Sequence, residues 1–169
     1  QLDRRLCASI VYRTLENLYA IDFALAAYLR DAEAIEPRVR NILRTAACQI
    51  LLHDRVPDSA AVNEAVKITR AIGMEPFVGM VNAVLRKFVT NWLDLPPLPA
   101  GSAAETLSIR YSHPKWLVKR LVKLLGAEEA EAFLKADNGN VTLDGIDVSQ
   151  SETWKQFTGA YIDDGFLID

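Results

Sequence analysis

Basic side chains are the residues of this chain whose type and spacing could do chemistry. Ammonium and guanidinium groups pair with phosphates, and the planar guanidinium group also stacks on unpaired bases. For each basic residue the alternative is a solvated face of a helical bundle, and both interpretations stay open. The candidates for contact with a nucleic acid are Arg4, Arg5, Arg13, Arg44, Arg55, Lys67, Arg70, Arg86, Lys87, Lys115, Lys119 and Lys123.

Three of these lysines form a regular pattern. Lys115, Lys119 and Lys123 recur every four residues, which places them on one stripe of a helix that begins after Pro114. Residues 110–123 contain five basic side chains and no acidic one. We expect the stripe either to face a phosphate backbone or to be the solvated side of a helix whose apolar side packs on the bundle. The apolar residues predicted to face away from it are Trp116, Leu117, Leu121, Leu124 and Leu125.

Cysteine and histidine could supply nucleophiles, bases or metal ligands. Cys7 and Cys48 lie among apolar helical residues, so we predict small buried hydrophobic side chains rather than a disulfide. His53 and His113 stand far apart, without the spacing of a zinc site. No carboxylate or nucleophile is placed beside His113 by sequence, so capping or packing is the favoured role. We therefore predict no catalytic residue and no metal site.

Composition limits the class of protein. A chain of 169 residues, 50% of them hydrophobic, suffices for one core and a smaller appendage. No apolar run reaches the roughly 18 residues of a membrane span, and no signal peptide is visible, which predicts a soluble, cytoplasmic protein. Residues 1–92 carry 12 basic and 10 acidic side chains, whereas residues 93–169 carry 7 and 12. Any affinity for RNA must therefore come from patches.

The first helices are predicted from apolar spacing. Residues 4–29 form one long helix or two in close succession. Pro37 suits the first turn of the next helix, which ends near His53. The stripe expected to be buried in residues 4–29 consists of Leu6, Ile10, Val11, Leu15, Leu18, Phe23, Leu25 and Leu29.

Two further helices follow a short loop. Asp58 or Ser59 is predicted to cap a helix that Gly73 ends in a left-handed conformation. Pro76 then opens a helix that continues to about Trp92.

The stretch 95–101 holds three prolines and cannot continue a helix, so it predicts a domain boundary. Ser102 with Glu105 resembles a capping box for a short helix. Ser112 and Pro114 are predicted to be the cap and first residue of another.

The remaining residues complete the predicted fold. Helices are expected near 115–125 and 127–136, and short strands and turns from Val141 onward. The fold class is therefore mainly all-α: a helical bundle, a short helical linker and a partial α/β appendage.

Two asparagines stand inside apolar helical patterns, Asn63 in Val62–Val66 and Asn82 in Val81–Val84. Asn is unfavourable inside a helix because its amide competes for backbone groups, so matched positions predict fixed partners. RNA contact is one role, but we favour buried amides, whose unpaired burial would cost roughly 1 to 3 kcal/mol. We therefore expect Asn63→Ala to lower stability more than RNA affinity.

Residues 56–88 resemble the signature of the NusB family of RNA-binding helical domains, and three blocks of the sequence resemble a family in which such a domain is extended. They are DRRLCASIVYRTLENLYAIDFAL (Asp3 to Leu25), VPDSAAVNEAVKITR with VNAVLRKF (within 56–88), and RYSHPKWLVKRLV (Arg110 to Val122). The third block narrows the resemblance to the RsmB (Sun) family of bacterial 16S ribosomal RNA cytosine-5 methyltransferases, in which a NusB-like domain precedes the methyltransferase domain.

This resemblance implies an organisation and a function. Residues 1–93 would be a NusB-like RNA-binding domain without its first helix, 94–113 a linker, and 114–169 part of the N-terminal subdomain of the methyltransferase region. The implied partner is small-subunit ribosomal RNA, and S-adenosylmethionine is implied as cofactor of the full-length parent. The alternative is an interaction module, as in antitermination, with a protein partner or a homodimer. No membrane association is expected.

The resemblance also predicts gaps. Residues are expected to be missing before Gln1 and between Leu143 and Asp144. The family's chemistry needs a Cys thiolate that adds to cytosine, and neither Cys7 nor Cys48 stands in such a motif. No Gly-rich loop follows a strand. We therefore expect the chain as given to bind no cofactor itself and to transfer no methyl group.

Overall fold

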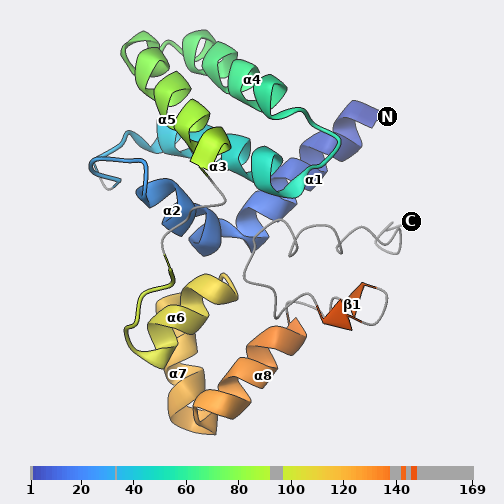
Figure 1. The fold of residues 1–169 in the computed structure, drawn as a ribbon, viewed down its shortest axis with the longest axis vertical. Helices are drawn as coiled ribbons and strands as arrows, with labels where there is room; N and C mark the ends of the chain where they lie inside the picture. Colours follow the sequence, from blue (N-terminus) through green and yellow to red (C-terminus); the bar gives the residue numbers. More distant parts are fainter. Residues whose placement is uncertain (1, 33, 92–96, 138–141, 144–145, 148–169) are drawn as a thin grey trace.

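The computed structural model describes residues 2–32, 34–91, 97–137, 142–143 and 146–147. Figure 1 shows two groups of helices, α1–α5 above and α6–α8 below. The first group consists of α1 (Leu2–Glu16), α2 (Leu18–Ala26), α3 (Pro37–Leu52), α4 (Asp58–Ala71), the short 3-10 helix η1 (Glu75–Phe77) and α5 (Val78–Asn91). The second consists of α6 (Ala103–Arg110), α7 (Lys115–Leu125) and α8 (Ala127–Asp137).

The break between α1 and α2 lies at Asn17. Its backbone leaves the helical region, at φ −108° and ψ 21°, while its side-chain amide donates to the carbonyl of Arg13 at 2.9 Å. The Arg13 carbonyl also accepts the backbone N–H of Asn17 at 3.1 Å, so both donors of Asn17 share one acceptor where α1 ends. The predicted helical run over residues 4–29 is therefore two helices in close succession.

The buried stripe predicted for α1 is wrong in part. Leu6, Val11 and Leu15 are exposed, with 41%, 47% and 61% of their surface accessible. The reason is that α1 packs on α3 through a different and partly polar face, which includes the buried Thr14. Helical spacing alone could not decide which of two apolar faces the bundle would cover.

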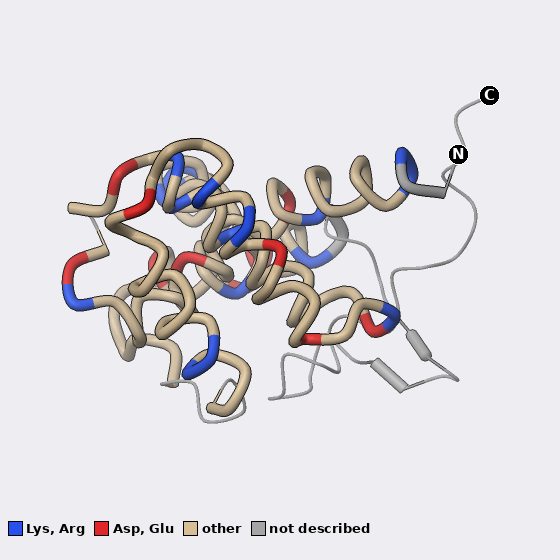
Figure 2. Tube along the Cα trace, turned by 90° about the horizontal axis from the view of Figure 1, so that it is seen from above, with Lys and Arg blue, Asp and Glu red and all other residues tan. Residues whose placement is uncertain are grey.

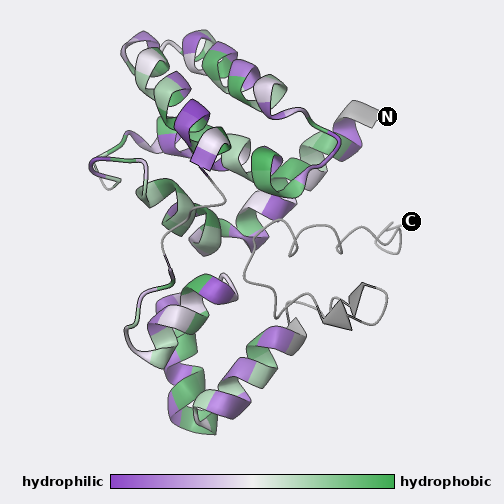
Figure 3. Cartoon of the chain, in the orientation of Figure 1, coloured by the Kyte–Doolittle hydropathy of each residue, from purple (hydrophilic) through white to green (hydrophobic). Residues whose placement is uncertain are grey.

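The central helix of the bundle is α3, which packs against α1, α2, α4 and α5. Pro37 is its first residue, as predicted, and the Glu36 carboxylate accepts the N–H groups of Arg38 (2.8 Å) and Val39 (3.1 Å). This cap satisfies two of the donors that a helix start leaves open. Hydrophobic and hydrophilic residues alternate around the helices (Figure 3). The largest fully buried side chains of the bundle are Phe88, Ile21, Leu25, Leu43, Leu51 and Leu85.

The predicted cap of α4 is wrong, and its predicted end is confirmed. Pro57 occupies the cap position without a side-chain hydrogen bond, so Asp58 lies in the first turn, where its charge complements the helix dipole. Gly73, at φ +75°, donates to the Arg70 carbonyl at 2.9 Å. The left-handed conformation at this turn favours glycine.

A second hydrophobic cluster, separate from that of the bundle, joins α6, α7 and α8. Val118, Leu134 and Leu107 lie at its centre, and α6 also packs against α2 of the bundle. Thus α6, which falls within the predicted linker, packs with α7 and α8. The domain limits stay a prediction.

The predicted caps of α6 and α7 differ from the structure. Ser102 is the cap residue of α6, but its side chain makes no capping bond, and the Glu105 carboxylate accepts Lys115 Nζ at 2.9 Å instead. Pro114, not Ser112, is the cap residue of α7. Ser112 has φ +53° and belongs to the turn that ends α6.

The described part of the tail is a short antiparallel pair, β1 (Thr142–Leu143) with β2 (Ile146–Asp147). The rest of the predicted α/β appendage, from residue 148 onward, lies outside the described residues, as does Trp92. In the part of the chain that the structure describes, no helix has both the length and the apolarity to cross a bilayer.

Candidate nucleic-acid interface

Basic and acidic residues are interspersed along the helices, with basic residues also near the start of α1 (Figure 2). A basic side chain whose donors already serve a carboxylate is less available to a phosphate, because a ligand must compete with that partner. We therefore group the candidate basic residues by the exposure of their side chains and by the protein groups that already accept their hydrogen bonds.

Arg13 is buried, with 9% of its surface accessible, and its Nη1 donates to the carbonyl of Leu52 at the end of α3. A guanidinium group at the last carbonyls of a helix satisfies an open acceptor and complements the helix dipole. This position joins α1 to α3. It does not place Arg13 on a surface that RNA could reach, so Arg13 is corrected to a structural residue.

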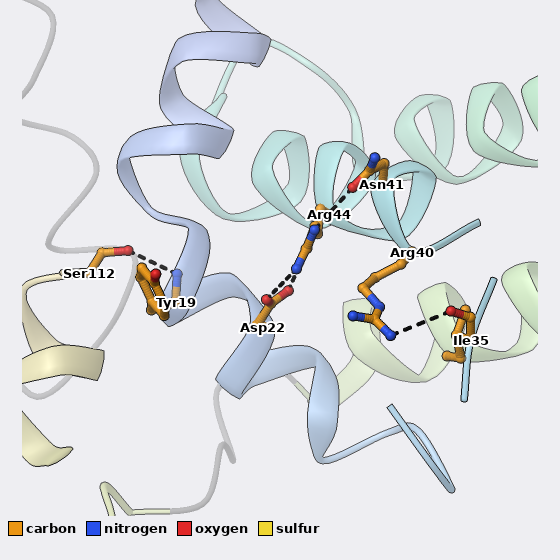
Figure 4. Close-up of polar contacts among 7 residues, drawn as sticks. All are labelled: Tyr19, Asp22, Ile35, Arg40, Asn41, Arg44 and Ser112. Atoms are coloured by element: carbon orange, nitrogen blue, oxygen red, sulfur yellow. Dashed lines mark hydrogen bonds and ion pairs between the residues drawn. The ribbon is translucent and has the colours of Figure 1, made fainter. Parts of the chain in front are cut away.

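Arg44 is also engaged within the bundle. Its Nε and Nη2 donate to the two carboxylate oxygens of Asp22, at 2.7 and 2.6 Å, and its Nη1 donates to Asn41 Oδ1 at 3.0 Å (Figure 4). The Asp22 carboxylate raises the pKa of the Arg44 guanidinium. This bidentate contact holds α2 against α3 and gives Arg44 a structural role, and its predicted contact with RNA stays a prediction.

Four exposed candidates have partners on the surface. Lys67 Nζ contacts Glu64 at 2.6 Å, and Arg70 Nε contacts Glu75 at 3.5 Å. Arg86 Nε donates to Asn82 Oδ1 at 3.0 Å, and Lys115 is bound by Glu105. Exposed contacts of this kind contribute little free energy. These four residues therefore stay candidates for contact with a nucleic acid, but weaker ones than the cations without a partner.

The other exposed candidates form no ion pair with any described residue. Arg4 and Arg5 are adjacent at the start of α1, and Tyr12 follows on the same helix with 66% of its surface exposed. Tyr12 is not among the candidates that the sequence predicts, because an aromatic residue in an amphipathic pattern normally predicts core. The exposed candidates without any described side-chain partner are Arg4, Arg5, Arg55, Lys87, Lys119 and Lys123.

The two helix asparagines are not buried amides. Asn63 is exposed and makes no side-chain hydrogen bond with a described residue. Asn82 is half-buried and accepts from Arg86, one turn later on the same helix. The predicted burial is therefore wrong for both, and Asn63 joins the surface that a ligand could contact.

The cysteines and histidines lie apart in the structure. Cys7 is exposed, so its predicted burial is wrong, whereas Cys48 is buried and burial raises the pKa of its thiol to about 11. His53 Nε2 lies 3.2 Å from Ser9 Oγ, and burial lowers the pKa of His53. Among the described residues, no three His, Cys, Asp or Glu side chains are grouped to hold a metal ion.

His113 takes part in the end of α6 through its backbone. Its N–H donates to the Ser108 carbonyl at 3.0 Å, and Ser108 Oγ donates to the carbonyl of His113 at 2.6 Å. These bonds agree with the structural role that the sequence predicts for this position.

The fold and its exposed cations define an all-α protein whose accessible chemistry is that of a binding surface. Residues 1–90 match the sequence model of the NusB family, which is more than half of the 169 residues, and the chain belongs to the NusB family. This confirms the fold expected from the resemblance of the sequence blocks.

Relatives extend the similarity beyond the bundle. The chain is 33% identical over 137 residues to the probable ribosomal RNA small subunit methyltransferase B of Bacillus subtilis (strain 168), covering 79% of this chain and 30% of the relative. It is 30% identical over 150 residues to the protein of the same name from Synechocystis sp. (strain ATCC 27184 / PCC 6803 / Kazusa), covering 84% and 32%. It is 33% identical over 119 residues to the ribosomal RNA small subunit methyltransferase B of Shewanella oneidensis, covering 70% and 26%. The chain thus spans about a third of the length of the relatives it matches.

Proposed function

We propose that this chain is the RNA-recognition part of an S-adenosylmethionine-dependent 16S ribosomal RNA cytosine-5 methyltransferase of the bacterial cytoplasm. The methyl transfer itself would reside in a catalytic domain outside this chain. The described residues hold no strand followed by a glycine-rich turn that would fit the cofactor, so no catalytic step is assigned to them.

One observation carries the proposal. The alignments with the methyltransferase relatives extend over 119 to 150 residues, whereas the NusB family match covers residues 1–90. The similarity therefore continues into the α6–α8 unit, which packs on α2. A bundle that served antitermination alone would not need this second unit.

The surface that we assign to ribosomal RNA consists of exposed candidate cations that have no described side-chain partner. Such groups release counterions when they meet phosphates, which is the main source of affinity for a nucleic acid. Arg4 and Arg5 are the best placed, because two adjacent guanidinium groups stand at the exposed start of α1. Arg55 and Lys87 are the remaining members on the bundle, and Lys119 and Lys123 lie on α7.

The second candidate is an interaction module that binds a protein or a second copy of the chain. The observation in its favour is the exposed apolar face of α1, where Val11, Tyr12 and Leu15 all lie open. Contiguous apolar residues on a surface commonly mark a protein interface.

Binding to overlapping segments of unmodified 16S ribosomal RNA, followed by fluorescence anisotropy over a range of salt concentrations, tests the proposal. We compare the Arg4→Gln, Arg5→Gln double variant with the Lys67→Gln, Arg70→Gln double variant, which removes the same charge from cations that have acidic partners. We expect the first pair to weaken binding and to lower the salt slope by about 2, and the second pair to do so less.

The outcomes separate the two candidates. Equal losses in both double variants would mean that net charge, not the α1 surface, governs binding. No binding to any segment, together with self-association that Leu15→Ala abolishes, would replace the proposal with the interaction module.

A further inference from the structure

Trp116, the second residue of α7, is largely open to solvent, with 66% of its surface exposed. An indole ring is costly to leave in water and is usually buried or held at an interface. The sequence predicts that Trp116 faces away from the lysine stripe, and packing of this apolar side on the bundle is one of the two interpretations that it leaves open. The α6–α8 cluster is filled instead by the opposite face of α7, through Val118, Leu121 and Val122.

The neighbours of Trp116 on the exposed face of α7 are cations. Lys119 and Arg120 follow at three and four residues, which places both beside the indole, and Lys123 lies one turn further. All three are exposed and form no ion pair with a described residue. By contrast, Lys115 pairs with Glu105, and Arg110 pairs with Glu131 at 2.8 Å.

The charges that α7 itself carries have one sign. Helix α7 contains four basic residues and no acidic one. A partner that covers it must therefore be anionic to avoid leaving uncompensated charge, and it must offer flat apolar groups to cover the indole. Single-stranded RNA offers both, because its phosphates pair with Lys and Arg while its unpaired bases stack on aromatic rings.

The dimensions of the face suit a short strand. A helix rises 1.5 Å per residue, so Trp116 and Lys123 are separated by about 10 Å along the axis of α7. That length corresponds to about three stacked nucleotides at 3.4 Å each. The site also lies beside the bundle, because Ser112, four residues before Trp116, is hydrogen-bonded to Tyr19 of α2.

We propose that Trp116, Lys119, Arg120 and Lys123 form a second RNA-binding site, on which an unpaired base stacks on the indole and adjacent phosphates pair with the three cations. This inference rests on the proposed RNA-binding function and assigns to it a ligand class, single-stranded RNA, and a stacking residue. Duplex RNA does not fit the site, because its bases are stacked on each other and closed to an indole.

Fluorescence of Trp116 tests the site directly. The chain has three tryptophans, so a Trp92→Phe, Trp154→Phe background leaves Trp116 as the only emitter. We expect a single-stranded RNA decamer to quench this emission with saturation, and the duplex of the same sequence to quench it far less. In the natural background, Trp116→Ala should weaken binding of the decamer about 5- to 100-fold.

Matched variants identify the cause. Trp116→Phe keeps an aromatic ring and should retain most of the affinity, whereas Trp116→Leu keeps only apolar surface and should lose it. The Lys119→Gln, Arg120→Gln, Lys123→Gln triple variant should lower the salt slope by about 2, because each phosphate contact on a single strand contributes about 0.7. Leu124→Ala removes an apolar side chain that is 70% exposed on the same helix and should leave RNA binding unchanged.

Three results would overturn the inference. Unchanged affinity in Trp116→Ala, while Arg4→Gln, Arg5→Gln still weakens binding, would reject the second site and leave the proposed function intact. Absence of RNA binding by the natural chain would reject both. Self-association in sedimentation that Trp116→Ala and Leu124→Ala both abolish would show that this face contacts protein instead.

Discussion

The hydroxyl oxygen of Ser112 accepts the backbone N–H of Tyr19 at 3.0 Å and so joins the α6–α8 unit to the bundle (Figure 4). Tyr19 is the second residue of α2, where the helix itself offers its N–H no partner. Asn17, the cap residue of α2, gives it none, because its side chain makes no capping bond. Ser112 therefore caps a helix of the neighbouring unit.

The conformation of Ser112 explains how its hydroxyl reaches that N–H. Ser112 N donates to the Ile109 carbonyl at 3.3 Å, and His113 N donates to the Ser108 carbonyl at 3.0 Å, which is the pattern of a helix end with a left-handed residue. Glycine is the usual residue at such a position. A serine at φ +53° carries a conformational cost that the bond to Tyr19 offsets.

Two substitutions at Ser112 separate the hydroxyl from the conformation. Ser112→Ala keeps the conformational cost of the left-handed backbone and loses the hydrogen bond to Tyr19. We therefore expect it to lower the free energy of unfolding by about 1 kcal/mol. Ser112→Gly also loses the bond but relieves the cost, so its unfolding free energy should stay near that of the natural chain. Hydrogen exchange of the Tyr19 amide should accelerate in both variants. Persisting protection of that amide would show that another group caps α2.

The pair formed by Arg44 and Asp22 gives a second prediction. In a double-mutant cycle with Arg44→Met and Asp22→Asn, we expect a coupling energy of about 1 kcal/mol, because the contact is bidentate but Asp22 is partly open to solvent and screened. Urea denaturation at low and high salt measures it.

The same variants report on RNA. Because the donors of Arg44 already serve Asp22 and Asn41, Arg44→Met should leave RNA affinity within about twofold of the natural chain once binding is corrected for the folded fraction. A tenfold loss would return Arg44 to the interface.

The helices could be predicted from the sequence because their signals are local. Pro37 and Gly73 mark a helix start and a helix end through their own backbone preferences, and the structure places both as expected. What lies against a helix is not local. Leu15 and Trp116 stand in amphipathic patterns that predict burial, yet both side chains are exposed in the part of the chain that the structure describes.

The candidate site was predictable to the same degree. Residue type identified Arg4 and Arg5 as cations, but the availability of a cation depends on partners from other elements. Arg13 meets the end of α3, and Arg44 meets a carboxylate of α2. Neither partner follows from spacing along the chain, because each contact joins residues 22 or more positions apart.

Asn63 gives a prediction opposite to the one that the sequence suggests. Because Asn63 is exposed in the interior of α4 and has no described side-chain partner, Asn63→Ala should raise the free energy of unfolding by about 0.5 kcal/mol through helix propensity. Asn82→Ala is the matched control, and its gain should be smaller because it removes the acceptor of Arg86. Thermal and urea denaturation measure both. A destabilised Asn63→Ala would restore the interpretation of a bonded structural amide.

The two cysteines should react at very different rates. Cys7 is exposed, whereas Cys48 is buried and burial raises the pKa of its thiol to about 11, so near pH 8 the Cys48 thiol is both covered and protonated. With Ellman's reagent we expect one thiol to react rapidly in the folded chain and the second only on unfolding. Cys7→Ser should remove the rapid phase entirely. Two rapid equivalents in the natural chain would place Cys48 at the surface.

His53 makes the stability of the bundle depend on pH. Burial lowers its pKa from the ordinary value of 6.5, so between the two values the unfolded chain binds a proton that the folded chain does not. Its contribution is therefore fully present above pH 6.5 and is lost as the pH falls towards the folded-state pKa. We expect the melting temperature to fall between about pH 7.5 and about pH 5.5, and to fall less in His53→Gln, which cannot titrate. Ser9→Ala is the control, because it removes only the hydroxyl group beside Nε2 and leaves a buried imidazole that still titrates. If the melting temperature falls by the same amount in His53→Gln as in the natural chain over this pH range, the pH dependence comes from other groups.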